Sequence, residues 1–204
     1  MDVQVATSLV RVCAAREAIG NEMDLMVDAH GTMSVAQAKL FCNGASEFDL
    51  RFVEEPVISD NRAGLAEVRA ATTLPIAAGE SEFTRFDFAE LINHRSVDVV
   101  QPDLAITGGF SEGLKIAALC EAHRLQLAPH CWGSAISFRA GLTLAFASSA
   151  GEYMEVPMGG DPLLHELASI DLELKHGSLA PPSGPGWGVE PDPDFMKRFA
   201  MNRI

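Results

Sequence analysis

The chain has 204 residues, 48% of them hydrophobic, which is enough apolar material for a buried core of domain size. Its formal net charge of −13 argues against nucleic acid or an anionic membrane as a partner, since both attract basic surfaces. The sequence shows no signal-peptide pattern and no apolar run of about 18 residues, and its four cysteines lack CxxC spacing. We therefore expect a cytoplasmic protein with reduced thiols.

The first 22 residues have apolar positions at helical spacing, and Gly20 is placed to end that helix. Beyond it, short apolar runs alternate with further segments of helical spacing. Ser34, Thr84 and Ser111 are candidate N-caps for three of these segments. The expected later helices cover residues 35–45, 64–71, 85–93, 112–123 and 134–149.

Six apolar runs, each bounded by turn signals, close on an ionisable residue. Successive ionisable residues lie 23 to 27 positions apart, which fits one strand, one helix and two loops. Because parallel strands need a crossover of a dozen or more residues, this period predicts βα units of the (β/α)₈ barrel type. A closed barrel needs about 250 residues and eight strands, so we expect an incomplete barrel of about six parallel strands with helices outside. The six terminal residues are Asp28, Glu54, Glu80, Asp103, His130 and Glu155.

After Pro157 the period stops. We expect two parts, a partial barrel over residues 1–157 and a Pro/Gly-rich C-terminal extension with a short helix over 158–204. Within the extension, a strand is expected over 172–175, and Trp187 is expected to pack against an apolar partner.

Asp28, Glu54 and Glu80 end three successive expected strands, so their carboxylates should converge on one rim. Three carboxylates in close proximity repel one another unless some are protonated or a cation lies among them. Mg²⁺ accepts a few carboxylates and keeps positions for water and substrate oxygens. The sequence therefore predicts a magnesium site, although each acid taken singly also fits a solvated loop position.

Asp103 and His130 end the next two strands and should be neighbours on the rim. A carboxylate that binds one ring nitrogen fixes the tautomer and makes the other nitrogen a general base near neutral pH. Glu155 ends the last strand and, if protonated, would donate a hydrogen bond to a developing oxyanion. The alternative for His130 is a structural bond to a backbone carbonyl.

His30 lies two residues beyond Asp28, so on a continued strand both side chains face the same way. It is a candidate second acid or base, or a hydrogen-bonding residue behind the site. By the same alternation Glu55 should point away from Glu54, as a loop or surface acid. Cys131 and Trp132 are expected to shape the pocket or pack behind His130.

As a set, these stretches resemble the barrel domain of the mandelate racemase and muconate lactonizing enzyme group of the enolase superfamily, most of all the galactonate-type acid-sugar dehydratases. The similarity covers roughly residues 3 to 195. It is carried by the stretches Val27-Asp28-Ala29-His30-Gly31, Val53-Glu54-Glu55-Pro56, Ala78-Gly79-Glu80, Gln101-Pro102-Asp103, Ala128-Pro129-His130 and Met154-Glu155.

The resemblance implies that Asp28, Glu54 and Glu80 bind Mg²⁺ and that His130 with Asp103 removes the proton α to a carboxylate, giving an enediolate. It implies that Glu155 lies beside that enediolate and that His30 protonates the departing β-hydroxyl. The implied reaction is a hydro-lyase step that converts an aldonic or aldaric acid into a 2-keto-3-deoxy sugar acid.

The sequence also departs from the family. Members carry a capping domain and two barrel strands before the helix with which this chain begins, and no lysine here ends a strand. Two alternatives therefore stay open. One is racemisation or epimerisation with His30 as second base, and the other is a truncated or split fragment that is inactive without a partner. We expect a homo-oligomer or complementation by a missing N-terminal portion, since open strand edges invite pairing.

Overall fold

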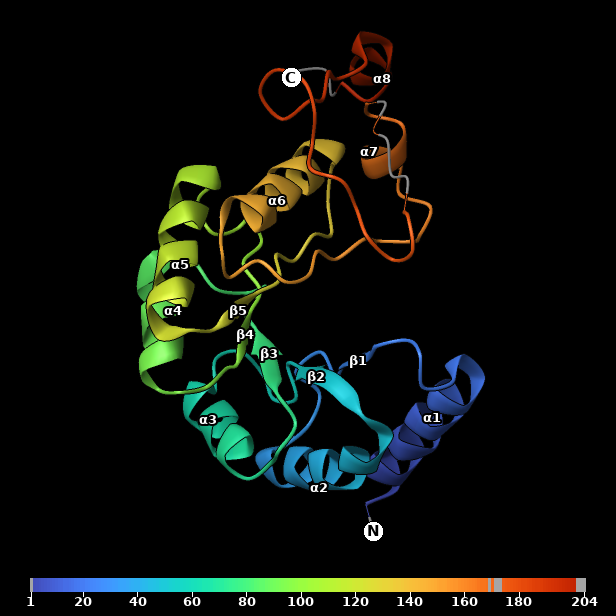
Figure 1. The fold of residues 1–204 in the computed structure, drawn as a ribbon, viewed down its shortest axis with the longest axis vertical. Helices are drawn as coiled ribbons and strands as arrows, with labels where there is room; N and C mark the ends of the chain where they lie inside the picture. The colour runs from blue at the N-terminus through green and yellow to red at the C-terminus, as the bar shows by residue number, and fades with distance from the viewer. Residues whose placement is uncertain (1, 169, 171–173, 201–204) are drawn as a thin grey trace. The chain divides into compact units, whose positions relative to one another are not determined.

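The structure, a computed structural model, describes residues 2–168, 170 and 174–200 (Figure 1). It contains two compact units. The first comprises residues 1–82 and 86–101, and the second comprises residues 83–85 and 102–204. The expected boundary between residues 157 and 158 stays a prediction. Within the described part of the chain, every helix is too short or too polar to cross a lipid bilayer.

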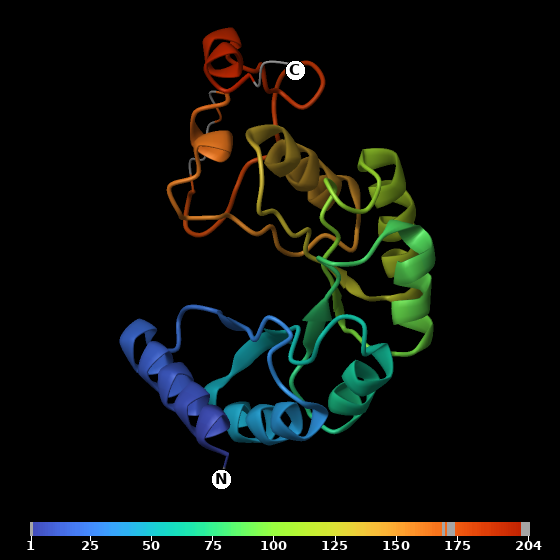
Figure 2. The ribbon, with the colours of Figure 1, turned by 180° about the vertical axis from the view of Figure 1, so that it is seen from behind.

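In the first unit, helices alternate with four parallel strands that follow one another in the order β1-β2-β3-β4. In both views, α1, α2 and α3 follow one another along one side of the strands β1 to β3 (Figures 1 and 2). The alternation confirms the predicted α/β class. The elements are α1 (Val3–Ile19), β1 (Leu25–Asp28), α2 (Val35–Ala45), the 3₁₀ helix η1 (Ser46–Phe48), β2 (Leu50–Glu54), α3 (Arg62–Ala70), β3 (Ile76–Ala78), α4 (Thr84–Asn93, its first two residues grouped with the second unit) and β4 (Val99–Val100).

The strands of this unit differ in burial, since β1 is only partly buried and β2 has the exposed Arg51. β3 and β4 are buried along their whole length, the pattern expected of parallel strands between two layers of side chains. Helix side chains close the core from outside, among them the fully buried Phe41, Leu65 and Phe88. Gly79 follows β3 with φ of 143°, and a Cβ there would lie 2.9 Å from Gln101 N. Only glycine fits at this turn, which leads to Glu80.

The second unit is built from α5 (Phe110–His123), β5 (Gln126–Leu127), α6 (Ala135–Ala147), α7 (Pro162–His165) and α8 (Pro193–Arg198). Its core joins Cys131, Phe138, Leu142 and Leu164. Trp187 packs against Phe110 with ring centroids 4.6 Å apart, as expected for an anchor of the Pro/Gly-rich segment.

Three expectations about local structure are wrong. Residues 153–155 form no strand, because the chain pairs in parallel with β5 only through a bridge between Leu127 and Gly151. Thr84 does not cap α4 but is its first residue, with φ of 51°. α5 begins one residue before Ser111, because Gly109 with φ of 86° provides its N-terminus. The strand expected over 172–175 falls partly on residues 171–173, which lie outside the described residues.

Arg16 of α1 fixes the loop that enters β1 and the turn that enters β2. Its guanidinium donates hydrogen bonds to four backbone carbonyls, those of Phe48 at 2.9 Å, Asp49 at 2.8 Å, Gly20 at 2.9 Å and Met23 at 2.8 Å. Because a cation donates each bond, the set stabilises the packing of α1 beside both strands.

We predict that Arg16→Ala lowers the free energy of unfolding by about 2–3 kcal/mol, the cost of losing hydrogen bonds to a charged group in a partly exposed setting. Urea denaturation followed by circular dichroism measures this change. Arg11→Ala on the same helix, at an exposed position, is the matched control and should change stability by no more than about 0.5 kcal/mol. Equal effects of the two substitutions would contradict the role given to Arg16.

Candidate active site

The carboxyl ends of β1, β2 and β3 carry the predicted metal ligands in the first unit. Asp28 is the last residue of β1 and pairs in register with Glu54, the last residue of β2. Glu80 lies two residues beyond β3, directly after Gly79. The backbone N–H of Ala29 donates to Glu54 O at 2.9 Å, so the loops after β1 and β2 leave the sheet together.

His30 does not continue β1, so the expectation that it faces the same way as Asp28 on a continued strand is wrong. The strand ends at Asp28, and His30 has a left-handed φ of 49° within a turn. Its backbone N–H donates to Asp28 Oδ1 at 2.7 Å, which fixes that turn. The turn still brings the ring to the carboxylates, with Nδ1 3.9 Å from Asp28 Oδ2 and 3.8 Å from Glu80 Oε1.

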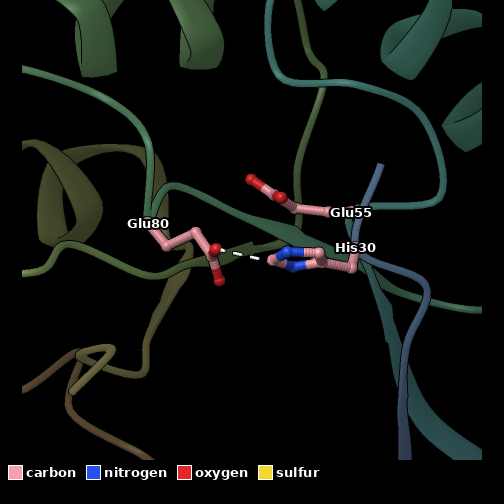
Figure 3. A group of neighbouring side chains, drawn as sticks. All are labelled: His30, Glu55 and Glu80. Carbon is pink, nitrogen blue, oxygen red and sulfur yellow. Dashed lines mark ion pairs between the residues drawn. The ribbon is translucent and has the colours of Figure 1, made fainter. Parts of the chain in front are cut away.

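Glu55 lies in the loop after β2, as expected, but it is not a surface acid. Only 5% of Glu55 is exposed, and its left-handed φ of 37° breaks the alternation on which the expectation depended. The side chains of His30 and Glu55 extend toward Glu80 (Figure 3). One ligand atom from each of the three residues lies within 4.8 Å of the others. The sequence signal was the acid pair before Pro56, but a positive φ at a glutamate cannot be inferred from it.

Glu55 is the most perturbed acid of this group. Burial, together with the negative charges of Glu80 and Asp28, raises the pKa of its carboxyl to about 7, while the charge of His30 opposes this rise. Its Oε1 atom is buried and has no hydrogen-bond partner. A buried carboxylate oxygen in this state is stabilised by a proton or by a cation.

These residues fit a divalent cation. The three predicted ligands offer carboxylate oxygens, the donor type that Mg²⁺ prefers, and the unpartnered Oε1 of Glu55 lies in the same group. The group that lies within 4.8 Å differs from the predicted trio, because His30 and Glu55 accompany Glu80 in place of Asp28 and Glu54. Asp28, Glu54 and Glu80 therefore stay a prediction as the ligand set.

The second unit brings together the predicted proton-transfer residues. His130 Nδ1 lies 2.8 Å from Asp103 Oδ2, and both side chains are nearly buried. Burial by itself would raise the pKa of Asp103, but the hydrogen bond with His130 and one from the backbone N–H of Ala105 lower it below its usual value. An ionised Asp103 only accepts hydrogen bonds, so Nδ1 carries the proton and Nε2 is left to accept one.

Glu155 faces the other nitrogen of the same imidazole. Its Oε2 lies 3.6 Å from His130 Nε2 and accepts a hydrogen bond from the backbone N–H of Cys131 at 3.1 Å. The side chain of Glu155 is 41% exposed, whereas that of His130 is 13% exposed. Asp103, His130 and Glu155 thus form one hydrogen-bonded and electrostatic group, with solvent access at the glutamate.

The residues after His130 have different environments. Cys131 is fully buried in the core of the second unit, and burial raises the pKa of its thiol to about 12. A thiol in that state packs and does not act as a nucleophile. Trp132 is 70% exposed, so it does not pack behind His130, and its role in shaping the pocket stays a prediction. Its backbone N–H helps to lower the pKa of Asp103.

We predict that Glu55 makes the metal-free protein less stable as the pH rises. Its pKa is raised from 4.5 to about 7 on folding, so the folded state binds the proton more tightly. The free energy of unfolding should therefore fall between pH 4.5 and pH 7, by up to about 3 kcal/mol at 1.36 kcal/mol per pKa unit. Glu55→Gln should flatten this slope and exceed the wild type in stability at pH 8.

Urea denaturation in EDTA at a series of pH values measures the effect. Glu22→Gln, at an exposed position of the same unit, is the matched control and should follow the wild type. Identical pH profiles for Glu55→Gln and the wild type would show that the buried carboxylate is compensated in another way.

Comparison with known proteins places this geometry in context. The sequence model of a family described as enolase C-terminal domain-like matches residues 1–195. A D-galactonate dehydratase from Xanthomonas oryzae pv. oryzae is 36% identical over 204 residues, which is 97% of this chain and 53% of that protein. A D-galactonate dehydratase from Ralstonia pickettii is 38% identical over 194 residues, covering 92% of this chain and 51% of that protein.

A solved structure is also similar. The 3,6-anhydro-D-galactonate cycloisomerase from Zobellia galactanivorans superimposes with a TM-score of 0.90 at 32% identity, over 96% of this chain and 55% of that one. The chain thus spans about half the length of the curated relatives that it matches.

Proposed function

Since the chain belongs to the enolase C-terminal domain-like family, we propose that it carries the chemistry of a Mg²⁺-dependent acid-sugar dehydratase. The family match confirms the resemblance stated from the strand ends and the fold class of an incomplete parallel barrel. Relatives at 36% and 38% identity are named D-galactonate dehydratases, and this supports a hydro-lyase. The chain spans about half of their length, so substrate and activity are proposals here.

In this proposal the first unit supplies the cation. Asp28, Glu54 and Glu80 would hold Mg²⁺ at the carboxyl ends of β1, β2 and β3. When bound, Mg²⁺ supplies the charge that makes removal of a weakly acidic proton beside a carboxylate feasible. The support is the donor chemistry of the three carboxylates and the unpartnered buried oxygen beside them.

The second unit would supply the base. Asp103 holds the Nδ1 proton of His130, so Nε2 would take the proton α to the substrate carboxylate. Glu155 lies 3.6 Å from Nε2 and would stabilise the imidazolium or, when protonated, the oxyanion. The single observation that carries the proposal is this 2.8 Å contact between a nearly buried Asp103 and His130, in a chain of this family.

His30 would assist loss of the β-hydroxyl. Its side chain is 74% exposed and so accessible to a substrate, and it lies beside Asp28 and Glu80. The same placement supports the second candidate function, racemisation or epimerisation at the α-carbon, in which His30 would act as a second base. Proton loss without loss of the hydroxyl distinguishes the second candidate from dehydration.

The substrate would be a small carboxylate, an aldonic or aldaric acid, and we propose assembly as a homo-oligomer or with a complementary chain. Size-exclusion chromatography with light scattering reports the oligomeric state of the 204-residue chain.

We predict that the protein with Mg²⁺ converts one member of an aldonic and aldaric acid panel, headed by D-galactonate, into a 2-keto-3-deoxy acid. Colorimetric detection of the 2-keto product measures this. His130→Asn should lower the rate by at least about 100-fold, the lower end of what a positioned general base contributes. Glu80→Gln should abolish the Mg²⁺-dependent activity. His94→Asn, at a partly exposed histidine, is the control and should retain the wild-type rate. Equal turnover in the wild type and His130→Asn would contradict the proposal.

A further inference from the structure

We propose that His30, Glu55 and Glu80 form a second, mixed nitrogen and oxygen cation site that takes Zn²⁺. It would exclude Mg²⁺ from the first unit because both sites use Glu80. The inference goes beyond the proposed function and depends on it only for the shared ligand. Zn²⁺ that binds reversibly at this site would inhibit the proposed dehydratase.

The first support is geometric. One ligand atom each from His30, Glu55 and Glu80 lies within 4.8 Å of the others. Ligand atoms around one Zn²⁺ at about 2.0–2.2 Å lie no more than about 4.4 Å apart, so the group is close to the required size. His30 is exposed at the turn after β1, and a rotation of its side chain would close the remaining gap.

The second support is the state of Glu55. This glutamate is 5% exposed, its Oε1 has no hydrogen-bond partner, and its side chain extends into the group (Figure 3). Burying a carboxylate without a partner costs free energy that a bound cation would recover. Glu55 is not one of the predicted magnesium ligands, and its buried, unpartnered oxygen points to a ligand at this group.

The donor set decides which cation fits. Imidazole suits Zn²⁺ and other late first-row ions, whereas Mg²⁺ prefers oxygen ligands and retains several waters. Asp28 and Glu54 offer oxygens only, and His30 adds the nitrogen that favours Zn²⁺ over Mg²⁺. Zn²⁺ bound here would also occupy the imidazole proposed to protonate the departing hydroxyl.

His94 provides a comparison within the same unit. Its Nδ1 lies 3.7 Å from Glu90 Oε2, so it too is a histidine beside a carboxylate, and it is about half exposed. Glu90 lies on α4 and His94 directly follows that helix, and the exposed Glu90 carries no burial penalty for a cation to relieve. If a histidine beside an acid were enough to bind Zn²⁺, a site would form at both His30 and His94. If the buried Glu55 is also required, a site forms only at His30.

The test is calorimetric titration of the metal-stripped 204-residue chain with ZnCl₂ and, separately, with MgCl₂. His30→Gln and Glu55→Gln should weaken Zn²⁺ binding by at least the roughly tenfold that even an outer-shell partner costs. His94→Gln and His130→Gln should bind Zn²⁺ as the wild type does. Zn²⁺ should displace Mg²⁺ from the wild type, and circular dichroism melts verify that each variant is folded.

Glu54→Gln separates this inference from the proposed function. It should weaken Mg²⁺ binding and leave Zn²⁺ binding intact. If Glu54→Gln keeps the wild-type affinity for both ions, Glu54 is not a magnesium ligand, and the proposed Zn²⁺ site is unaffected. Wild-type Zn²⁺ affinity in both His30→Gln and Glu55→Gln, or loss of Zn²⁺ in His130→Gln instead, would overturn the proposal.

Discussion

Repulsion among carboxylates at the ends of β1 to β3 is the constraint on which the first unit depends. Parallel strands bring their carboxyl ends to one edge of a sheet, and this edge carries five acids within a few residues of the strand ends. Such a set is stable only if each charge is compensated. The acids are Asp28, Glu54, Glu55, Glu80 and Glu82.

The structure compensates some of these charges with its own residues. Glu82 is 4% exposed and pairs with Arg62, whose Nη2 lies 2.5 Å from Oε2. His30 lies between Asp28 and Glu80, within 4 Å of both. Glu55 has only a raised pKa and an unpartnered oxygen, so a proton or a cation must complete its compensation. This need links the fold to metal binding.

The residues that end the six apolar runs were predictable because the chain repeats a βα period and parallel topology fixes which end of each strand is functional. The pairing of Asp103 with His130 follows from that period, and the structure brings the two together at 2.8 Å. Glu55 could not be placed, because alternation assumes extended backbone and its φ is 37°. The strand expected over residues 153–155 does not form, because β5 pairs with that segment only at Gly151. No local sequence pattern reveals this pairing.

In the proposed reaction, His130, held by Asp103, removes the proton α to the carboxylate of a sugar acid. The most direct measurement of this step is deuterium incorporation at C2 of D-galactonate, followed by proton NMR in D₂O with Mg²⁺ present, because exchange reports proton removal whatever happens to the hydroxyl. We predict exchange or deuterated product with the wild type and neither with His130→Asn. Exchange at the same rate in His130→Asn would contradict this prediction.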